Sequence, residues 1–305
     1  MARVVYEILK DIACKRGYEM TTFCHDWIIK LSNGEKNFYT YGYICSGSDS
    51  VSQQFCKDKS SLYELLTKFG IDTVPHHLFM GLKKQEIYLE HKLDISEIVD
   101  FFKANGDIVV KDNNGGSGRD VYLIKSENQI EHIVEDLLIR DKDIAYCPYY
   151  DSECECRVVV YNGNADIMFS KERIYVLGDG QKTIRELIVE KFGKEIVVDK
   201  WIDLKSIPQK EEKVVLSWMH NLRHGANPVD IVDDDFRGQL SEIACKVCKI
   251  IGIKFASVDI LKVKDKLIVL EVNSAVTLEK YAKTSKDNYQ KVKNLYEKIV
   301  LDNLE

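Results

Sequence analysis

The chain has 305 residues, 45% of them hydrophobic, and a formal net charge of −6 at pH 7. This length exceeds one average domain and can bury more than one apolar core, so several lobes are expected. The acidic balance argues against a nucleic-acid-binding protein, which would draw most of its affinity from basic residues.

The first predicted lobe covers residues 1–79 and begins with a helix. Asn33 and Gly34 stand between two β-prone runs and predict a hairpin turn. A second helix follows and is closed by Gly70. Its apolar residues share one helical face: Leu62, Leu65, Leu66 and Phe69.

The second predicted lobe covers residues 80–145 and the third covers residues 146–305. In the second, two short strands flank a glycine-rich turn, and a helix begins at Ser126 with Gln129 as its capping-box partner. In the third, strands alternate with helices. Several neighbouring strands are joined by turns too short for a parallel crossover, so the predicted class is α+β with mostly antiparallel sheets.

The glycine-rich turn contains Gly115, Gly116, Ser117 and Gly118 and lies between strands. Glycines allow a backbone to approach phosphate closely and to present N–H groups to it, and Lys111 at the end of the preceding strand adds a positive charge. No helix begins there, which excludes both a Walker P-loop and a dinucleotide-binding turn. The turn itself fits a phosphate-binding loop and an ordinary hairpin loop equally well.

A second motif is the predicted hairpin FASVDILKV-KDK-LIVLEVN. A three-residue turn at residues 264–266 would place Asp259 directly opposite Glu271, with Asn273 on the same face. Two facing carboxylates repel each other, and a divalent cation would remove the conflict. Oxygen ligands suit magnesium, so a magnesium site is favoured over the alternative, a solvated sheet face.

Cations accompany this hairpin on neighbouring strands. Strand alternation in SECECRVVVYNG places Glu155 and Arg157 on one face and Cys154 and Cys156 on the other. The next strand, read as the single run ADIMFSKERIYVL, carries Lys171 and Arg173. These cations could form ordinary ion pairs, or they could hold a triphosphate together with Lys111.

The remaining cysteines predict no further site, whereas His220 and His224 flank Asn221 and leave a substrate-contacting role open. The nine cysteines, an odd number, are interpreted as reduced thiols, and Cys245 and Cys248 lack a second pair at zinc spacing. His76 and His77 follow a proline and are expected to be exposed. No segment approaches the ~20 apolar residues of a membrane span, and no signal peptide is recognisable, so a soluble cytoplasmic protein without a membrane partner is expected.

These motifs, in this order, resemble the ATP-grasp superfamily, in particular the ATP-grasp module of cyanophycin synthetase and its glutathione-synthesising relatives. The resemblance covers about residues 56–280 and depends most on GDGQKTIREL, then NLRHG, then VDILKVKDKLIVLEVN. It implies three lobes, with ATP held between two antiparallel-sheet lobes. The implied activity is that of an ADP-forming carbon–nitrogen ligase, which joins a carboxylate to an amine through an acyl-phosphate.

The resemblance also implies roles for individual residues. Lys59 and Lys111 would contact ATP phosphates, beneath a mobile loop at Gly115, Gly116, Ser117 and Gly118. The catalytic group would be Arg157, Arg173 and Asn221, and the magnesium ligands Asp259, Glu271 and Asn273. The backbone of residues 145–148, with Tyr146 and Cys147, would read adenine. The implied cofactors are ATP and two magnesium ions, with manganese as an alternative ion.

The sequence departs from the family pattern at several places. Asp112 stands where relatives have proline, Asp120 replaces a glycine of the loop, and SAVTLEKY follows the metal motif in place of a proline-glycine continuation. The chain also lacks the long N-terminal extension and the C-terminal Mur-ligase-like half of cyanophycin synthetase, so cyanophycin synthesis is not inferred. Small carboxylate and amine substrates are expected, and homo-oligomerisation stays open. The alternatives are a ligase that modifies a ribosomal precursor peptide and a non-catalytic nucleotide-binding scaffold.

Overall fold

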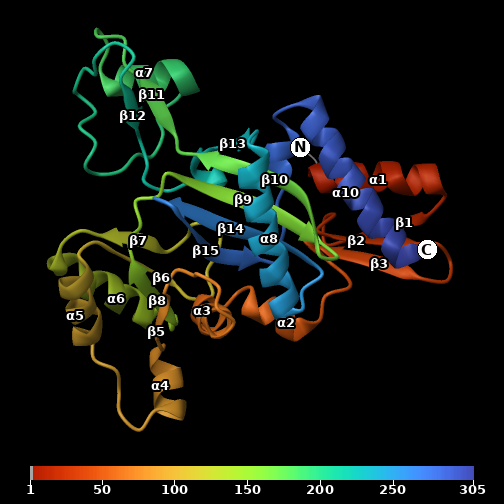
Figure 1. Cartoon of the computed structure of the whole chain (residues 1–305), viewed down its shortest axis with the longest axis horizontal. Helices are drawn as coiled ribbons and strands as arrows, with labels where there is room; N and C mark the ends of the chain where they lie inside the picture. The colour runs from red at the N-terminus through yellow and green to blue at the C-terminus, as the bar shows by residue number, and fades with distance from the viewer. Residues whose placement is uncertain (1–2) are drawn as a thin grey trace.

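The computed structural model describes residues 3–305, which fold into helices and four sheets (Figure 1). Every pair of neighbouring strands within these sheets is antiparallel. The predicted α+β class is therefore confirmed. None of the helices in the described residues is long and apolar enough to cross a bilayer.

The N-terminal lobe is built from both ends of the chain. Its sheet is a meander in the order β1-β2-β3-β4, and the turn at Asn33 and Gly34 joins β2 to β3. Helices α1 and α10 lie side by side over it (Figure 1), and the core includes Phe38 and Tyr296. The elements are α1 (Val4–Arg16), β1 (Glu19–Phe23), β2 (Ile28–Ser32), β3 (Asn37–Tyr41), β4 (Ile44–Cys45), α9 (Glu279–Ala282) and α10 (Lys286–Leu304).

Two short helices, α2 (Ser50–Phe55) and α3 (Lys59–Lys68), connect this lobe to the central lobe. The central lobe has the sheet order β5-β8-β6-β7, so β8 is an inner strand. The predicted capping box forms, because Gln129 Oε1 accepts a hydrogen bond from the Ser126 backbone N–H at 3.1 Å. The elements are β5 (His77–Phe79), α4 (Leu82–Tyr88), α5 (Ser96–Asn105), β6 (Ile108–Asp112), β7 (Val121–Ile124), η1 (Glu127–Gln129), α6 (Ile130–Ile139) and β8 (Ile144–Pro148).

The largest sheet has the strand order β13-β10-β9-β14-β15 and carries the candidate site. Its strands are β9 (Cys154–Tyr161), β10 (Asn164–Glu172), β13 (Asn227–Asp230), β14 (Phe255–Val263) and β15 (Lys266–Asn273). Helix α8 (Asp234–Ile251) covers one face, where its Leu240 and Val247 join a core with Val158 and Val258. On the opposite face, Val159 and Phe255 pack into the core of the N-terminal lobe. The polar residues of the site lie farther along that second face.

A small lobe of its own emerges between β10 and β13. The run ADIMFSKERIYVL, predicted as one strand, is broken after Glu172, and its end forms β11 (Tyr175–Leu177) in a separate sheet with β12 (Lys213–Val215). Helix α7 (Ile184–Phe192) and the 3₁₀ turn η2 (Leu222–His224) complete this region. The single-strand expectation fails because Ile174 and Val176 pack into the separate core of the small lobe. Figure 1 shows this lobe projecting from the large sheet.

Candidate active site

The hairpin of β14 and β15 pairs Asp259 with Glu271 and Ser257 with Asn273. The expected pairing of the two carboxylates is therefore present, but the expected three-residue turn is wrong. Val263 pairs with Lys266, which leaves a two-residue turn, and a register shift between Asp259 and Ile260 inserts one extra residue, Leu270, in β15. A bulge of this kind compensates for the shorter turn and restores the facing pair.

The three predicted metal ligands come together. Asn273 Nδ2 lies 3.1 Å from Glu271 Oε1 and 3.4 Å from Asp259 Oδ2. Their side chains offer two carboxylates and one amide oxygen, the hard oxygen donors that magnesium prefers. The donor set therefore fits a divalent ion such as magnesium.

Asp259 is completely buried and already ion-paired. Arg157 donates two hydrogen bonds to its carboxylate, from Nε at 2.8 Å and from Nη2 at 2.7 Å, and Lys171 Nζ lies 2.9 Å from Oδ2. Burial alone would raise the pKa of Asp259, but the charges of Arg157 and Lys171 outweigh it and hold the pKa well below its usual range. Lys171 also forms an ion pair with Glu155. Burial raises the pKa of Glu155, although the charge of Lys171 opposes this shift.

Glu271 stands in contrast to Asp259. No ion pair joins its carboxylate to a cation anywhere in residues 3–305, and its hydrogen bond comes from the neutral amide of Asn273. Glu271 and Asn273 can therefore accept a metal ion directly. Asp259 can share it only by giving up part of its contact with Arg157 or Lys171.

Two buried lysines lie near this hairpin, Lys111 on β6 of the central lobe and Lys59 at the start of the connecting helix α3. Lys111 lies on β6 and, by strand alternation, on the same face as Val109, which packs against Leu261 and Ile268 of the hairpin. Lys111 is 6% exposed, yet it forms no ion pair with any residue of the described chain. A buried ammonium group without a carboxylate is costly, so the position favours an anionic ligand.

Lys59, the second of these lysines, is the first residue of α3 and is 7% exposed. Its Nζ donates hydrogen bonds to the backbone carbonyls of Asn113 at 3.1 Å and Gly115 at 2.7 Å. Burial lowers the pKa of Lys59 to about 8, against the opposing charge of Glu271 and with the help of Lys111. Lys59 therefore fastens the base of the glycine-rich loop next to the site.

The glycine-rich loop reaches the small 3₁₀ turn across the site. Gly118 has φ +71°, and a Cβ atom there would lie 2.2 Å from Asn221 Nδ2 and 3.3 Å from His224 Nε2. Ser117 and Asp120 also have positive φ values, at 62° and 53°. The loop needs a glycine at position 118 both for its conformation and for its close approach to Asn221.

Gly118→Ala is expected to weaken ATP binding by roughly fivefold to thirtyfold, since an L-residue in this conformation costs about 1–2 kcal/mol and the methyl group displaces Asn221. Isothermal titration with ATP and magnesium measures the change. Gly163→Ala is the matched control, because it has the same strain (φ +77°) but meets nothing within 4 Å. Unchanged ATP affinity in Gly118→Ala would show that the loop does not contribute to the nucleotide site.

Asn221 and Arg173 stand at the rim of the site. Asn221 is the N-cap of η2, and its Oδ1 accepts a hydrogen bond from the Arg223 backbone N–H at 2.8 Å. Arg173, one residue past β10, lies 3.5 Å from the exposed Asp151 and keeps part of its own surface exposed. Neither residue touches the cluster of Asp259, whereas Arg157 does. The catalytic roles expected of all three stay predictions.

His220 holds the segment before η2 against β10. Its Nδ1 lies 2.7 Å from the carbonyl oxygen of Lys171, which can only accept a hydrogen bond, so Nδ1 carries the proton. Nε2 then accepts from Ser152 Oγ at 3.3 Å. Burial lowers the pKa of His220 to about 4. The imidazole is therefore neutral at pH 7 and positions the backbone of Lys171.

This low pKa predicts a pH-dependent stability. Between the ordinary value of 6.5 and about 4, the unfolded chain protonates His220 and the folded chain does not, so stability falls as the pH falls through this window. The loss from this group is about 1.4 kcal/mol per pH unit. His220→Asn should be less stable than the wild type at pH 7 and lose less stability between pH 7 and pH 5, measured by urea unfolding. His132→Asn, at an exposed histidine, should keep the wild-type pH dependence.

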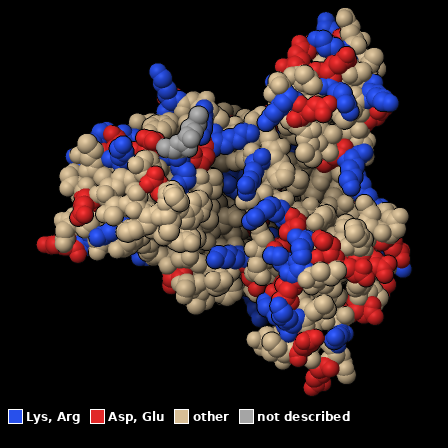
Figure 2. Space-filling model, turned by 180° about the vertical axis from the view of Figure 1, so that it is seen from behind, with Lys and Arg blue, Asp and Glu red and all other residues tan. Residues whose placement is uncertain are grey.

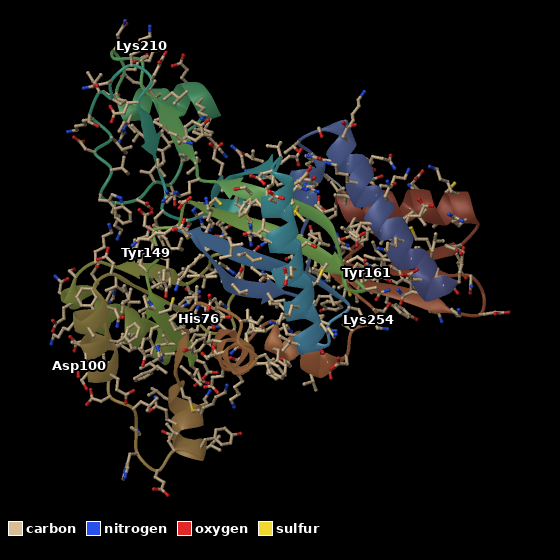
Figure 3. The ribbon with its side chains drawn as sticks, in the orientation of Figure 1. His76, Asp100, Tyr149, Tyr161, Lys210 and Lys254 are labelled. Atoms are coloured by element: carbon tan, nitrogen blue, oxygen red, sulfur yellow. The ribbon has the colours of Figure 1, made fainter. Side chains whose placement is uncertain are left out.

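His76 corrects another expectation, because it is 2% exposed rather than solvated. It lies where the central lobe meets the large sheet (Figure 3), and its Nε2 has no hydrogen-bond partner within the described residues. Burial, together with the charges of Lys111 and Lys59, keeps the pKa of His76 well below its ordinary value. A neutral histidine therefore flanks the two lysines without neutralising either.

The predicted adenine-reading segment is strand β8. Tyr146 pairs with Val110 of β6 and with His77 of β5, but the β5 ladder ends there, and Cys147 pairs only with Val109. At Cys147, the edge of β8 that faces β5 therefore has no strand partner within the described residues. The Tyr146 ring stacks on His77 at 5.4 Å, within the core of the central lobe. The adenine contact stays a prediction, and the backbone of Cys147 is its best placed part.

Sequence reasoning assigned Glu155 no role in the site and named Lys171 only as one of several cations for a triphosphate, although both are central to the buried cluster. Glu155 pairs with Lys171 across β9 and β10 only because a register shift lies between Ala165 and Ile167. Counting back from the Asn162 turn without that shift would have paired Glu155 with Ser170. Strand alternation places Glu155 on the same face as Arg157, and this was the signal in the sequence that could have assigned Glu155 to the site.

A hollow between the lobes is edged by Lys and Arg side chains (Figure 2). Within residues 3–305, no group of three or more His, Cys, Asp or Glu side chains is arranged to hold a metal ion. The oxygen site described above depends on an amide as its third ligand. A basic hollow beside such a site suits a polyanion held together with its cation.

The sequence is similar to one family model and to several curated proteins. Residues 218–296 match the model of the RimK-like ATP-grasp domain. Cyanophycin synthetase from Trichormus variabilis is 28% identical over an alignment that covers 88% of this chain and 31% of that protein. The chain thus spans about a third of the length of the curated relatives it matches.

Two solved structures share the fold. A bifunctional glutathione synthetase from Pasteurella multocida superposes with a TM-score of 0.59 at 16% identity, covering 97% of this chain and 44% of that one. The D-alanine–D-alanine ligase from Bacillus anthracis has a TM-score of 0.56 at 16% identity, covering 84% and 69%. At such low identity, these similarities establish the fold and leave the substrates open.

Proposed function

From the ATP-grasp fold of this chain, we propose that it is an ATP-dependent ligase. It joins a carboxylate to an amine through an acyl-phosphate and releases ADP and phosphate. The observation that carries the proposal is Lys111, a buried cation without a carboxylate partner in the described chain, on the face of β6 that packs against the hairpin of Asp259 and Glu271. A nucleotide polyphosphate would supply the missing anion.

The chemical obstacle is electrostatic, because an anionic carboxylate must attack an anionic phosphate. Lys111 and Lys59 would hold the phosphates, and Arg173 at the rim would meet the transferring phosphoryl group or the donor carboxylate. Magnesium, when bound, would neutralise phosphate charge, with Glu271, Asn273 and Asp259 as the residues that hold it. We propose two such ions, with manganese as an alternative.

The role that we propose for Arg157 differs from the catalytic role that the family resemblance implies. Both of its hydrogen bonds go to Asp259 in the structure. We therefore propose that Arg157 fixes the orientation of the Asp259 carboxylate and is released toward phosphate only when a cation takes its place. Arg173, whose ion pair within residues 3–305 is with the exposed Asp151, would then be the arginine that meets the substrate at the rim.

The loop from Asn113 to Asp120 would shield the acyl-phosphate from water. Its base is fixed, because Asn113 Oδ1 accepts from Ser60 Oγ at 2.9 Å and Asn113 Nδ2 donates to Asp58 at 2.9 Å. Its tip, in contrast, is near Asn221 through Gly118. A fixed base and a tip that approaches the opposite rim are the properties of a closing loop.

The test of this function is ADP release from ATP in the presence of magnesium. The full chain is assayed against a panel of free amino acids and short peptides, offered singly and in pairs. We expect ADP and phosphate to form only with a matched pair of carboxylate and amine. Release of AMP and pyrophosphate, or silence with every member of the panel while ATP still binds, would overturn the ligase assignment.

A further inference from the structure

Two cysteines on β9 lie directly behind the buried ion cluster. Cys154 and Cys156 occupy alternate positions on the strand and so share a face, with their sulfur atoms 3.7 Å apart. Cys156 is completely buried beneath α8, whereas Cys154 is partly exposed. Glu155, between them, points to the other face and binds Lys171.

The surroundings favour a reactive thiol at Cys154. Lys262 is its neighbour across β14 and forms an ion pair with Glu153 at 2.8 Å. The hydrogen bond from Cys156 and the charge of Lys262 lower the pKa of the Cys154 thiol to about 7, against the opposing effect of burial. A thiol of this kind is substantially a thiolate at neutral pH and reacts with oxidants much faster than a buried cysteine.

We propose that Cys154 and Cys156 are a redox-active dithiol, which a peroxide converts to an intramolecular disulfide that disturbs the adjoining ion cluster. The Cys154 thiolate attacks one oxygen of hydrogen peroxide, the O–O bond breaks, and water leaves after protonation. The Cys156 sulfur then attacks the resulting sulfenic acid, an S–S bond forms, and the S–O bond breaks to release a second water. Two thiols and one peroxide thus give one disulfide and two waters, and a dithiol reductant reverses the change.

The disulfide cannot form without a change in the strand. Residues two apart on an extended strand have Cα atoms separated by about 6.7 Å, near the upper limit of disulfide geometry, and the sulfur atoms must approach from 3.7 Å to about 2.05 Å. The strand must therefore shorten at Glu155. The backbone of Glu155 pairs with both Lys171 and Leu261 in the middle of the sheet. Shortening there draws Glu155 away from Lys171 and loosens the contact of Lys171 with Asp259.

The experiment treats the reduced full-length chain with hydrogen peroxide, blocks remaining thiols by alkylation and maps the tryptic peptide of residues 143–157. We expect this peptide to lose two hydrogens, with Cys154 and Cys156 protected from alkylation and Cys147 still alkylated. Cys154→Ala and Cys156→Ala should each prevent the disulfide, and Cys14→Ala, at an exposed thiol on α1, should leave it unchanged. A peptide that keeps both thiols, or that gains oxygen on Cys154 without a disulfide, would overturn the proposal.

A second arm measures the effect on the site and rests on the proposed function. The affinity for ADP with magnesium should fall by at least about tenfold in the oxidised chain, recover with dithiothreitol, and be insensitive to peroxide in Cys156→Ala. Unchanged affinity in the oxidised chain would overturn the link between disulfide and site. If the reduced chain binds no ADP, the proposed function fails and the link with it, while the disulfide itself is still decided by the peptide.

Discussion

Glu271→Gln is expected to lower the rate of ADP release roughly a hundredfold to a thousandfold, because a metal-ligating carboxylate supplies several kcal/mol of transition-state stabilisation. The fold should be unaffected. In the structure Glu271 is paired with no cation of residues 3–305, and its contact with Asn273 is one that a glutamine side chain can also make. The measurement is steady-state ADP release together with urea unfolding of the same preparation.

Asp265→Asn is the matched control for this variant, since it removes one carboxylate from the exposed turn of the same hairpin. Its rate should equal that of the wild type. If Glu271→Gln keeps near-normal activity, or responds to added magnesium as the wild type does, Glu271 is not a metal ligand.

Asp259→Asn has the largest expected effect on stability, a loss of about 3–5 kcal/mol. Arg157 would lose the negative charge that it binds and would face an amide NH₂ group in place of one of the two oxygens, and Lys171 would keep only Glu155 as a carboxylate partner. An uncompensated buried guanidinium is therefore left in the middle of the largest sheet. Urea unfolding measures the loss, with Asp265→Asn again as the reference.

The two substitutions thus separate two roles that the sequence pattern treats as one. The facing pair predicts equal metal ligands, whereas the structure pairs Asp259 with Arg157 and Lys171 and gives Glu271 no cationic partner among residues 3–305. If Asp259→Asn were as stable as the wild type, the ion pairs seen here would contribute little, and the account of Arg157 as an orienting residue would have to be abandoned.

Much of the fold could be predicted because its signals are local. Turn residues such as Asn33 and Gly34, the capping box at Ser126, and the alternation in the strand that carries Glu155 each reflect nearest-neighbour geometry. The placement of Asp259 opposite Glu271 was also predicted, although through a turn of the wrong length. The bulge at Leu270 restored the facing pair, and no nearby residue type predicts a bulge at that position.

The rest of the site depends on contacts between distant segments. Arg157 and Asp259 are 102 residues apart and meet only because β9 and β14 are neighbours in the sheet. Strand order of this kind follows from the packing of whole lobes and not from local periodicity. For the same reason the burial of His76, at the contact between central lobe and large sheet, contradicted the expectation of an exposed residue.

The transfer of oxygen during the reaction shows directly whether an acyl-phosphate forms. A carboxylate substrate from the active panel is labelled with ¹⁸O in both carboxyl oxygens, and the inorganic phosphate released in the full reaction is analysed by mass spectrometry. We predict one ¹⁸O atom in the phosphate and one in the amide product, because cleavage of an acyl-phosphate by the amine leaves the bridging oxygen on phosphorus. Phosphate without label, or label in AMP, would contradict the account.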